Sequence, residues 1–171
     1  MVRISAFFFL LPFCSSSQTL RLSSASAVLG GRVFIEISLQ SPKGIDVSAL
    51  QWEITFPATQ LSFLDKDTAA GAAASAAGKS VTCTQKPGAP PTGTPDDLTR
   101  FAKDGKVVAA GCMLYGGREP LPDGVAAKLG FQVAAGATPG SVPIGITRVL
   151  AVSKDLKTIS LKDANTTVNL R

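Results

Sequence analysis

Apolar residues recur at every second position along most of this chain, which is the pattern of β-strands that bury one face. The clearest example lies in residues 31–40, where the apolar positions are Val33, Ile35, Ile37 and Leu39. The same alternation recurs in residues 50–56, 125–133, 142–146 and 168–170. Short strands at this spacing predict an all-β chain, an antiparallel jelly-roll β-sandwich of about nine strands.

The residues between these segments fit the same architecture. The chain has 16 Gly and 11 Pro, and such frequent interruption excludes a coiled coil. Residues 86–97 contain four prolines and predict a long polar loop. Residues 107–114 are apolar at both parities, which predicts a strand covered on both sides. Only residues 67–78 favour a helix, a short Ala-rich one capped by Asp67 or Thr68.

The composition restricts the function classes open to this chain. It contains 0 His, which excludes Ser-His-Asp and Cys-His catalysis and most zinc sites. Glu36 and Glu53 are a candidate acid/base pair for glycoside hydrolysis, but exposed glutamates on strands are more often a solvated face. No loop has the ladder of Asp and Asn that a strong calcium site requires. We therefore predict no catalysis, no metal and no cofactor.

The positive charge is also spread too evenly for a nucleic-acid partner. The net charge of +5 comes from 17 Lys and Arg distributed along the whole chain among 12 acids. No segment holds a basic run that would neutralise a phosphate backbone. We predict no nucleic-acid binding.

The N-terminus has the three parts of a secretory signal peptide. Arg3 precedes an apolar run over residues 4–13, and small residues follow it. This run is shorter than the roughly 20 residues that a membrane-spanning helix needs. We predict a signal peptide over residues 1–17, secretion, and one domain over residues 18–171. The alternative is a cell-surface lipoprotein anchored through a lipid on Cys14.

Export changes what the cysteines predict. Removal of the signal leaves Cys83 and Cys112, each inside a strand-like run. An even count in an oxidising compartment predicts a disulfide between them. The alternative is two buried free thiols.

The order of these features resembles the cohesin domain, the β-sandwich module of cellulosome scaffoldins. The matching segments are residues 32–37, the strand 50–56 followed by Pro57, and then Leu61. Residues 124–133 (GVAAKLGFQV) resemble the later strand of the family, and the final strand matches residues 166–170. The resemblance implies a non-catalytic secreted module that binds a dockerin-like protein or a polysaccharide. The alternatives are a carbohydrate-binding module proper and a structural surface protein without a discrete ligand.

The resemblance also implies a candidate binding face. In cohesins the dockerin docks on a sheet face that includes outward positions of the strand matched here by residues 50–56. Carried over, that face presents Gln51, Glu53 and Thr55. Phe34 and Tyr115 are the aromatic candidates, since both have the outward parity or the strand-end position of exposed rings. Trp52, by contrast, has the parity of the core.

Overall fold

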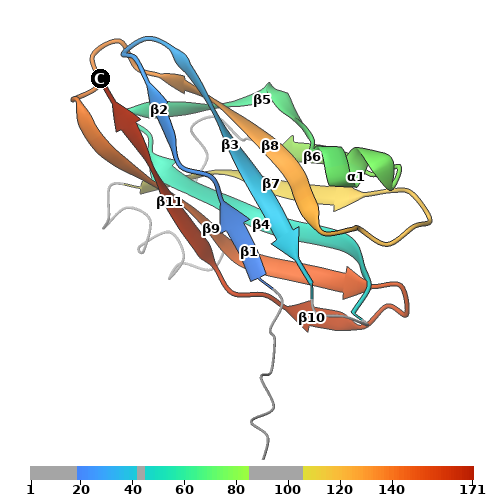
Figure 1. Cartoon of the computed structure of the whole chain (residues 1–171). Helices are drawn as coiled ribbons and strands as arrows, with labels where there is room; N and C mark the ends of the chain where they lie inside the picture. The colour runs from blue at the N-terminus through green and yellow to red at the C-terminus, as the bar shows by residue number, and fades with distance from the viewer. Residues whose placement is uncertain (1–18, 42–44, 85–105) are drawn as a thin grey trace, which may run out of the picture.

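Two β-sheets pack face to face in the computed structural model, which describes residues 19–41, 45–84 and 106–171 (Figure 1). The first sheet has four strands, in the order β1 (Thr19–Leu22), β3 (Arg32–Gln40), β8 (Gly124–Val133) and β5 (Leu61–Ala70). The second has seven strands: β2 (Ala25–Ala27), β11 (Ala164–Leu170), β9 (Gly140–Ser153), β4 (Val47–Pro57), β7 (Lys106–Tyr115) and β6 (Ser80–Thr84), with β10 (Thr158–Ser160) beside β9. The predicted all-β jelly-roll sandwich is confirmed.

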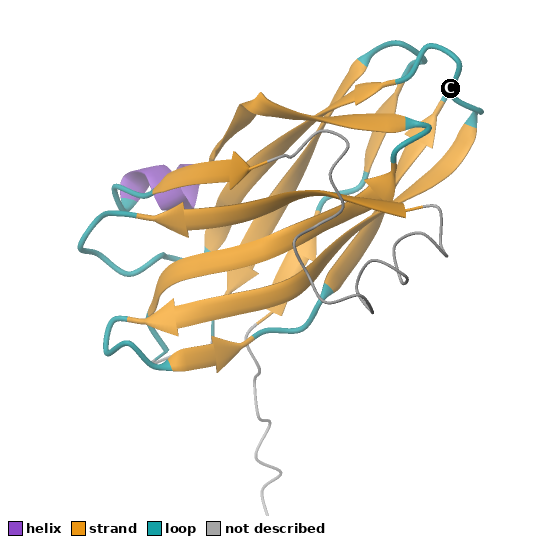
Figure 2. Ribbon diagram, turned by 180° about the vertical axis from the view of Figure 1, so that it is seen from behind, coloured by secondary structure: helices purple, strands orange, loops and turns teal. Residues whose placement is uncertain are grey.

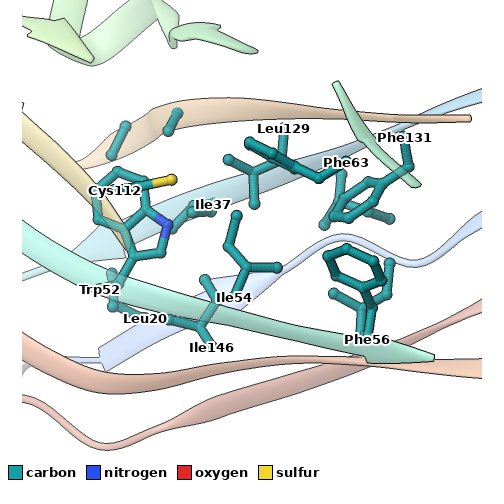
Figure 3. Close-up of a cluster of buried hydrophobic side chains, with 14 of the residues drawn as sticks. Leu20, Ile37, Trp52, Ile54, Phe56, Phe63, Cys112, Leu129, Phe131 and Ile146 are labelled. Atoms are coloured by element: carbon teal, nitrogen blue, oxygen red, sulfur yellow. The ribbon is translucent and has the colours of Figure 1, made fainter. Parts of the chain in front are cut away.

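The alternation of the sequence is the alternation of burial. Along β3 every second side chain is buried, and the residues between them are exposed or half-buried. β4 contributes Trp52, Ile54 and Phe56 to the same interior from the other sheet. Phe131 of β8 packs edge-to-face against Phe56 and Phe63, with ring centroids 5.3 and 5.5 Å apart (Figure 3). The core therefore forms where the inward faces of the two sheets meet.

The N-terminal strands tie the two sheets together. β1 pairs with β3 in the four-stranded sheet, while β2 pairs with β11 in the seven-stranded sheet. The β2–β11 pairing is parallel, whereas the other strand pairs described are antiparallel. The chain thus crosses from one sheet to the other between residues 22 and 25.

The predicted helix over residues 67–78 is wrong in its extent and its cap. β5 continues through Ala70, and the helix α1 covers only Ala72–Ala76. Asp67 and Thr68 do not cap it, because Asp67 bonds Arg32 and the Thr68 hydroxyl donates to the Leu64 carbonyl. The N-cap position is Gly71, where a Cβ atom would overlap Val125 of β8. Close approach to β8 therefore sets the start of the helix.

Three further expectations need correction or lie outside the described residues. β2 and β10, each of three residues, were not predicted, and they raise the described strands to eleven. β7 is not covered on both sides, since Met113 and Tyr115 are exposed. The signal peptide, Cys14 and the proline-rich loop fall outside the described residues. Within the described part of the chain, no helix has the length and apolar character to cross a membrane.

Candidate functional site

The predicted disulfide joins two neighbouring strands of the seven-stranded sheet. Cys83 of β6 lies directly opposite Cys112 of β7, with Cα atoms 4.1 Å apart, and the two form a disulfide bond. The bond lies on the inner side of the sheet, because Cys112 is buried and pairs in register with Trp52 of β4 (Figure 3). The edge strand β6 is therefore held covalently to the centre of the sheet.

Four of the five predicted binding residues lie on one surface, the outer face of the seven-stranded sheet, which Figure 2 views from its outer side. Gln51, Glu53 and Thr55 point outward from β4. Tyr115 lies on β7, the strand next to β4, and 44% of its surface is exposed. We call this surface, from β9 across β4 and β7 to β6, the docking face.

Phe34 does not share this face. It is exposed, as predicted, but it lies on β3 and therefore on the outer side of the other sheet. The Lys128 ammonium sits 4.5 Å from the centre of its ring, an arrangement in which the cation is attracted to the aromatic face. Nearby, Arg32 and Asp67 form an ion pair at 2.9 Å. The charges of this outer face are thus satisfied by local partners.

Two apolar residues of the docking face were missed by the sequence interpretation. Leu150 of β9 and Met113 of β7 lie opposite Gln51 on its two sides, and 41% and 42% of their surfaces are exposed. Together with Tyr115 they form what we call the apolar patch: Leu150, Met113 and Tyr115. The signal for Met113 was present, since it shares parity with Gly111 and Tyr115, and Cys112 and Leu114 are buried.

A polar cluster lies one step along the strands from the apolar patch. We call it the polar centre: Glu53, Thr147 and Arg148. Thr147 of β9 pairs with Glu53 of β4, and Arg148 Nη1 donates to Glu53 Oε1 at 3.1 Å. The other carboxylate oxygen, Glu53 Oε2, and the Thr147 hydroxyl oxygen are both buried and without a hydrogen-bond partner. Such unsatisfied buried groups are uncommon in proteins and call for an explanation.

The hypothetical hydrolytic pair is not assembled. Glu36 lies on β3 and Glu53 on β4, so the two carboxylates project from opposite outer faces of the sandwich. Trp52 is fully buried, which confirms its assignment to the core and removes it as a platform for sugars. In the described residues, no group of three or more His, Cys, Asp or Glu side chains is arranged to hold a metal ion.

The one buried charged side chain among the described residues is away from the docking face. Lys79, between α1 and β6, is only 5% exposed. Its ammonium donates to the Gly117 carbonyl at 3.3 Å. Burial lowers the pKa of Lys79, and the more distant Glu119 only partly opposes this. We interpret Lys79 as an anchor that holds the β7–β8 loop against the helix.

Comparison with solved structures identifies the fold. The chain is similar to the sixth cohesin of scaffoldin B from Acetivibrio cellulolyticus, a structure in complex with the Cel5 dockerin, at a TM-score of 0.67 and 18% identity, covering 91% of this chain and 100% of that one. It is similar to the cohesin of a Clostridium thermocellum OlpA–dockerin complex, at 0.66 and 15%, with the same coverages. A non-cellulosomal cohesin from the archaeon Archaeoglobus fulgidus gives 0.63 and 12%, covering 91% and 92%.

These similarities are structural rather than sequential. No protein-family model matches the sequence, and no curated protein matches it. The chain nevertheless has the cohesin fold, since the likeness extends over nearly all of it.

Proposed function

We propose that this cohesin-fold chain is a non-catalytic protein-binding module, and that a dockerin-type partner binds on the docking face. The observation that carries the proposal is the apolar patch, in which Leu150, Met113 and Tyr115 are each more than 40% exposed around Gln51. Strands lie about 4.8 Å apart, so Leu150 and Met113 are separated by roughly 10 Å across a flat sheet. Tyr, Met and Arg are the residues enriched in the cores of protein interfaces.

The contrast between the two outer faces supports the choice of this surface. On the four-stranded sheet, Arg32 is paired with Asp67 and the Phe34 ring carries Lys128. On the docking face, apolar side chains are exposed and two buried polar atoms lack partners. Solved cohesins bound to dockerins, such as that of scaffoldin B, supply the class of partner.

The test measures binding of purified dockerin modules to the exported protein. The probes are the Cel5 dockerin and every dockerin-like module encoded by the producing organism. Met113→Gln and Leu150→Gln should each weaken binding about tenfold, which corresponds to the loss of about 1.4 kcal/mol. The matched control is Phe34→Gln, a substitution of similar exposure on the opposite sheet. Equal losses for all three variants, or no binding by the unmodified protein, would refute the proposal.

The same samples test the polysaccharide alternative. The exposed aromatic residues of the described chain, Phe34 and Tyr115, lie on different sheets and do not form the flat strip of rings that crystalline polysaccharide needs. We therefore expect no pull-down on insoluble cellulose or chitin. Retention on these polymers that Tyr115→Ala abolishes would favour a carbohydrate-binding module instead.

We also propose that the protein acts outside the cell. The Cys83–Cys112 disulfide supports this, because structural disulfides persist in oxidising compartments. Export with cleavage after Ser17 predicts a mature chain that begins at Gln18. Intact-mass measurement of the secreted fraction checks this, and a membrane-bound form whose N-terminal Cys14 carries a lipid would show the lipoprotein alternative.

A further inference from the structure

Arg148 has a left-handed backbone in the middle of a β-strand, with φ of 53°. Only glycine adopts this region without strain, and strained residues cluster at functional sites. The strand register shows the reason for the conformation. Thr147 lies opposite Glu53 and Leu150 opposite Gln51, so Arg148 and Val149 share the space opposite Trp52. This two-against-one arrangement is a β-bulge in β9.

The bulge places Arg148 on the docking face. Val149, the other residue of the bulge, is buried, while Arg148 points outward to the Glu53 carboxylate. β-Bulges commonly re-aim a side chain beside a site. Without the extra residue, strict alternation would continue from Thr147, and residue 148 would face the core. The fold therefore accepts a strained residue to present this guanidinium.

The surroundings of Arg148 leave it accessible to a partner. Its side chain is 39% exposed, against 21% for that of Glu53. On the other side of Glu53 lies Gly111 of β7, where an added Cβ would meet no atom within 4 Å. Leu150 and Met113 stand one step further along the strands. The polar centre is thus a charged spot beside open space, bordered by apolar side chains.

We propose that Arg148 determines the specificity of the docking face, and that the partner places a carboxylate side chain on its guanidinium. This inference rests on the proposed function. A guanidinium has five N–H donors in a planar fork, so it can bond a second carboxylate while Glu53 stays in place. An approaching side chain meets the exposed guanidinium first, because Glu53 Oε2 is buried. Once the apolar patch excludes water, the lower local dielectric strengthens this charged contact.

The partner is therefore a protein surface with one acidic side chain among apolar ones. A surface with a basic side chain at the same place is rejected, because it would bring two like charges together in a desolvated interface. Arg148 consequently selects among partners that all satisfy the apolar patch.

The test selects partners from a defined library. The probe is a displayed library of the Cel5 dockerin with its surface positions randomised, selected in parallel on the unmodified protein and on the charge-reversed variant E53K/R148E. We expect Asp or Glu to be enriched at one position by the unmodified protein, and Lys or Arg at that position by the variant. The matched control is R32E/D67K, which reverses an ion pair on the opposite sheet and should leave the selection unchanged.

A second variant separates recognition from folding. Arg148→Gly relieves the left-handed backbone, so its melting temperature should not fall, yet binding of the acidic clones should weaken at least tenfold. Binding retained by Arg148→Gly, or identical enrichment by all three proteins, overturns the role of Arg148. If the selected clones lack acidic residues but still depend on Met113 and Leu150, the inference fails and the proposed function stands. If no clone is enriched, both fail.

Discussion

Removal of the Cys83–Cys112 bridge should reduce the free energy of unfolding by about 3–4 kcal/mol. The two cysteines are 29 residues apart in sequence, and on the chain-entropy account a closed loop of that length restricts the unfolded chain by about this amount. Small domains have about 5–15 kcal/mol of stability in total. The bridge therefore accounts for a large share of it.

The bridge also has a local role that the structure makes explicit. β6 has five residues and its strand pairing is with β7 alone. Without the covalent link, we expect β6 to separate from β7 before the rest of the sheet unfolds. Amide hydrogen exchange of Val81 and Thr82 should accelerate on reduction, while that of the central strands β4 and β8 changes only through the lower global stability.

The assay is urea unfolding of the oxidised protein, the reduced protein and the variant C83A/C112A, followed by the fluorescence of the buried Trp52. If the bridge acts through the unfolded state, its removal also raises the m value, because the unfolded chain expands and exposes more surface. An unchanged m value with a large loss of stability would place the effect in the folded state instead. A loss below about 1 kcal/mol would refute the loop-closure argument altogether.

Three further predictions concern the core and its supports. Trp52→Ala should cost about 3–5 kcal/mol of unfolding free energy, whereas Trp52→Phe should cost far less, because the Trp52 indole N–H is buried without a partner and its loss removes an unsatisfied donor; equal costs by urea unfolding would contradict this. Gly117→Ala should be strongly destabilising, since Gly117 is left-handed and a Cβ would clash with the Ala77 carbonyl; Gly136→Ala, where a Cβ meets nothing within 4 Å, is the near-neutral control. Because burial lowers the pKa of Lys79 in the folded state, the unfolded state binds more protons, and stability should rise as the pH increases toward the ordinary lysine pKa of 10.5; Lys79→Met should abolish this slope in pH-dependent thermal melts.

The strands were predictable because one physical signal defines them. A half-buried strand must alternate, so residues 32–40 and 124–133 could be recognised without knowledge of their partners. The pairing of Cys83 with Cys112 was predictable for a similar reason, since both lie in such strands and few alternatives remain after export. The resemblance to cohesins added the sheet face on which Gln51, Glu53 and Thr55 were expected.

What could not be predicted depends on contacts between distant segments. Alanine favours helix, so residues 67–71 were assigned to the helix; the structure instead pairs Ala69 and Ala70 with β8, because tertiary pairing overrides local propensity. The face of Phe34 was equally hidden, since alternation shows that a side chain points outward but not from which sheet. Arg148 was missed because the bulge breaks the alternation, and its position depends on the register against β4.

The costly features of the seven-stranded sheet lie together in one seam. Among the described residues, the buried side-chain atoms without a hydrogen-bond partner are Trp52 Nε1, Glu53 Oε2 and Thr147 Oγ1, all on the neighbouring strands β4 and β9. The left-handed Arg148 lies in the same seam. Each unsatisfied group costs about 1–3 kcal/mol, so the seam is a local weakness in the sheet that also carries the apolar patch.

The disulfide lies on the other side of β4, in the same sheet, and its expected stabilisation of about 3–4 kcal/mol is of the same order as that cost. We infer that the bridge offsets the strain of the seam and so allows the docking face to keep Arg148 in a conformation that glycine would adopt more easily. This makes a specific coupling expected between the two features. Arg148→Gly should raise the melting temperature of the reduced protein, because relief of the left-handed backbone replaces part of what the bridge supplied. If Arg148→Gly instead lowers the melting temperature of both the oxidised and the reduced protein, Arg148 stabilises the sheet, and the bulge is a structural element rather than a binding one.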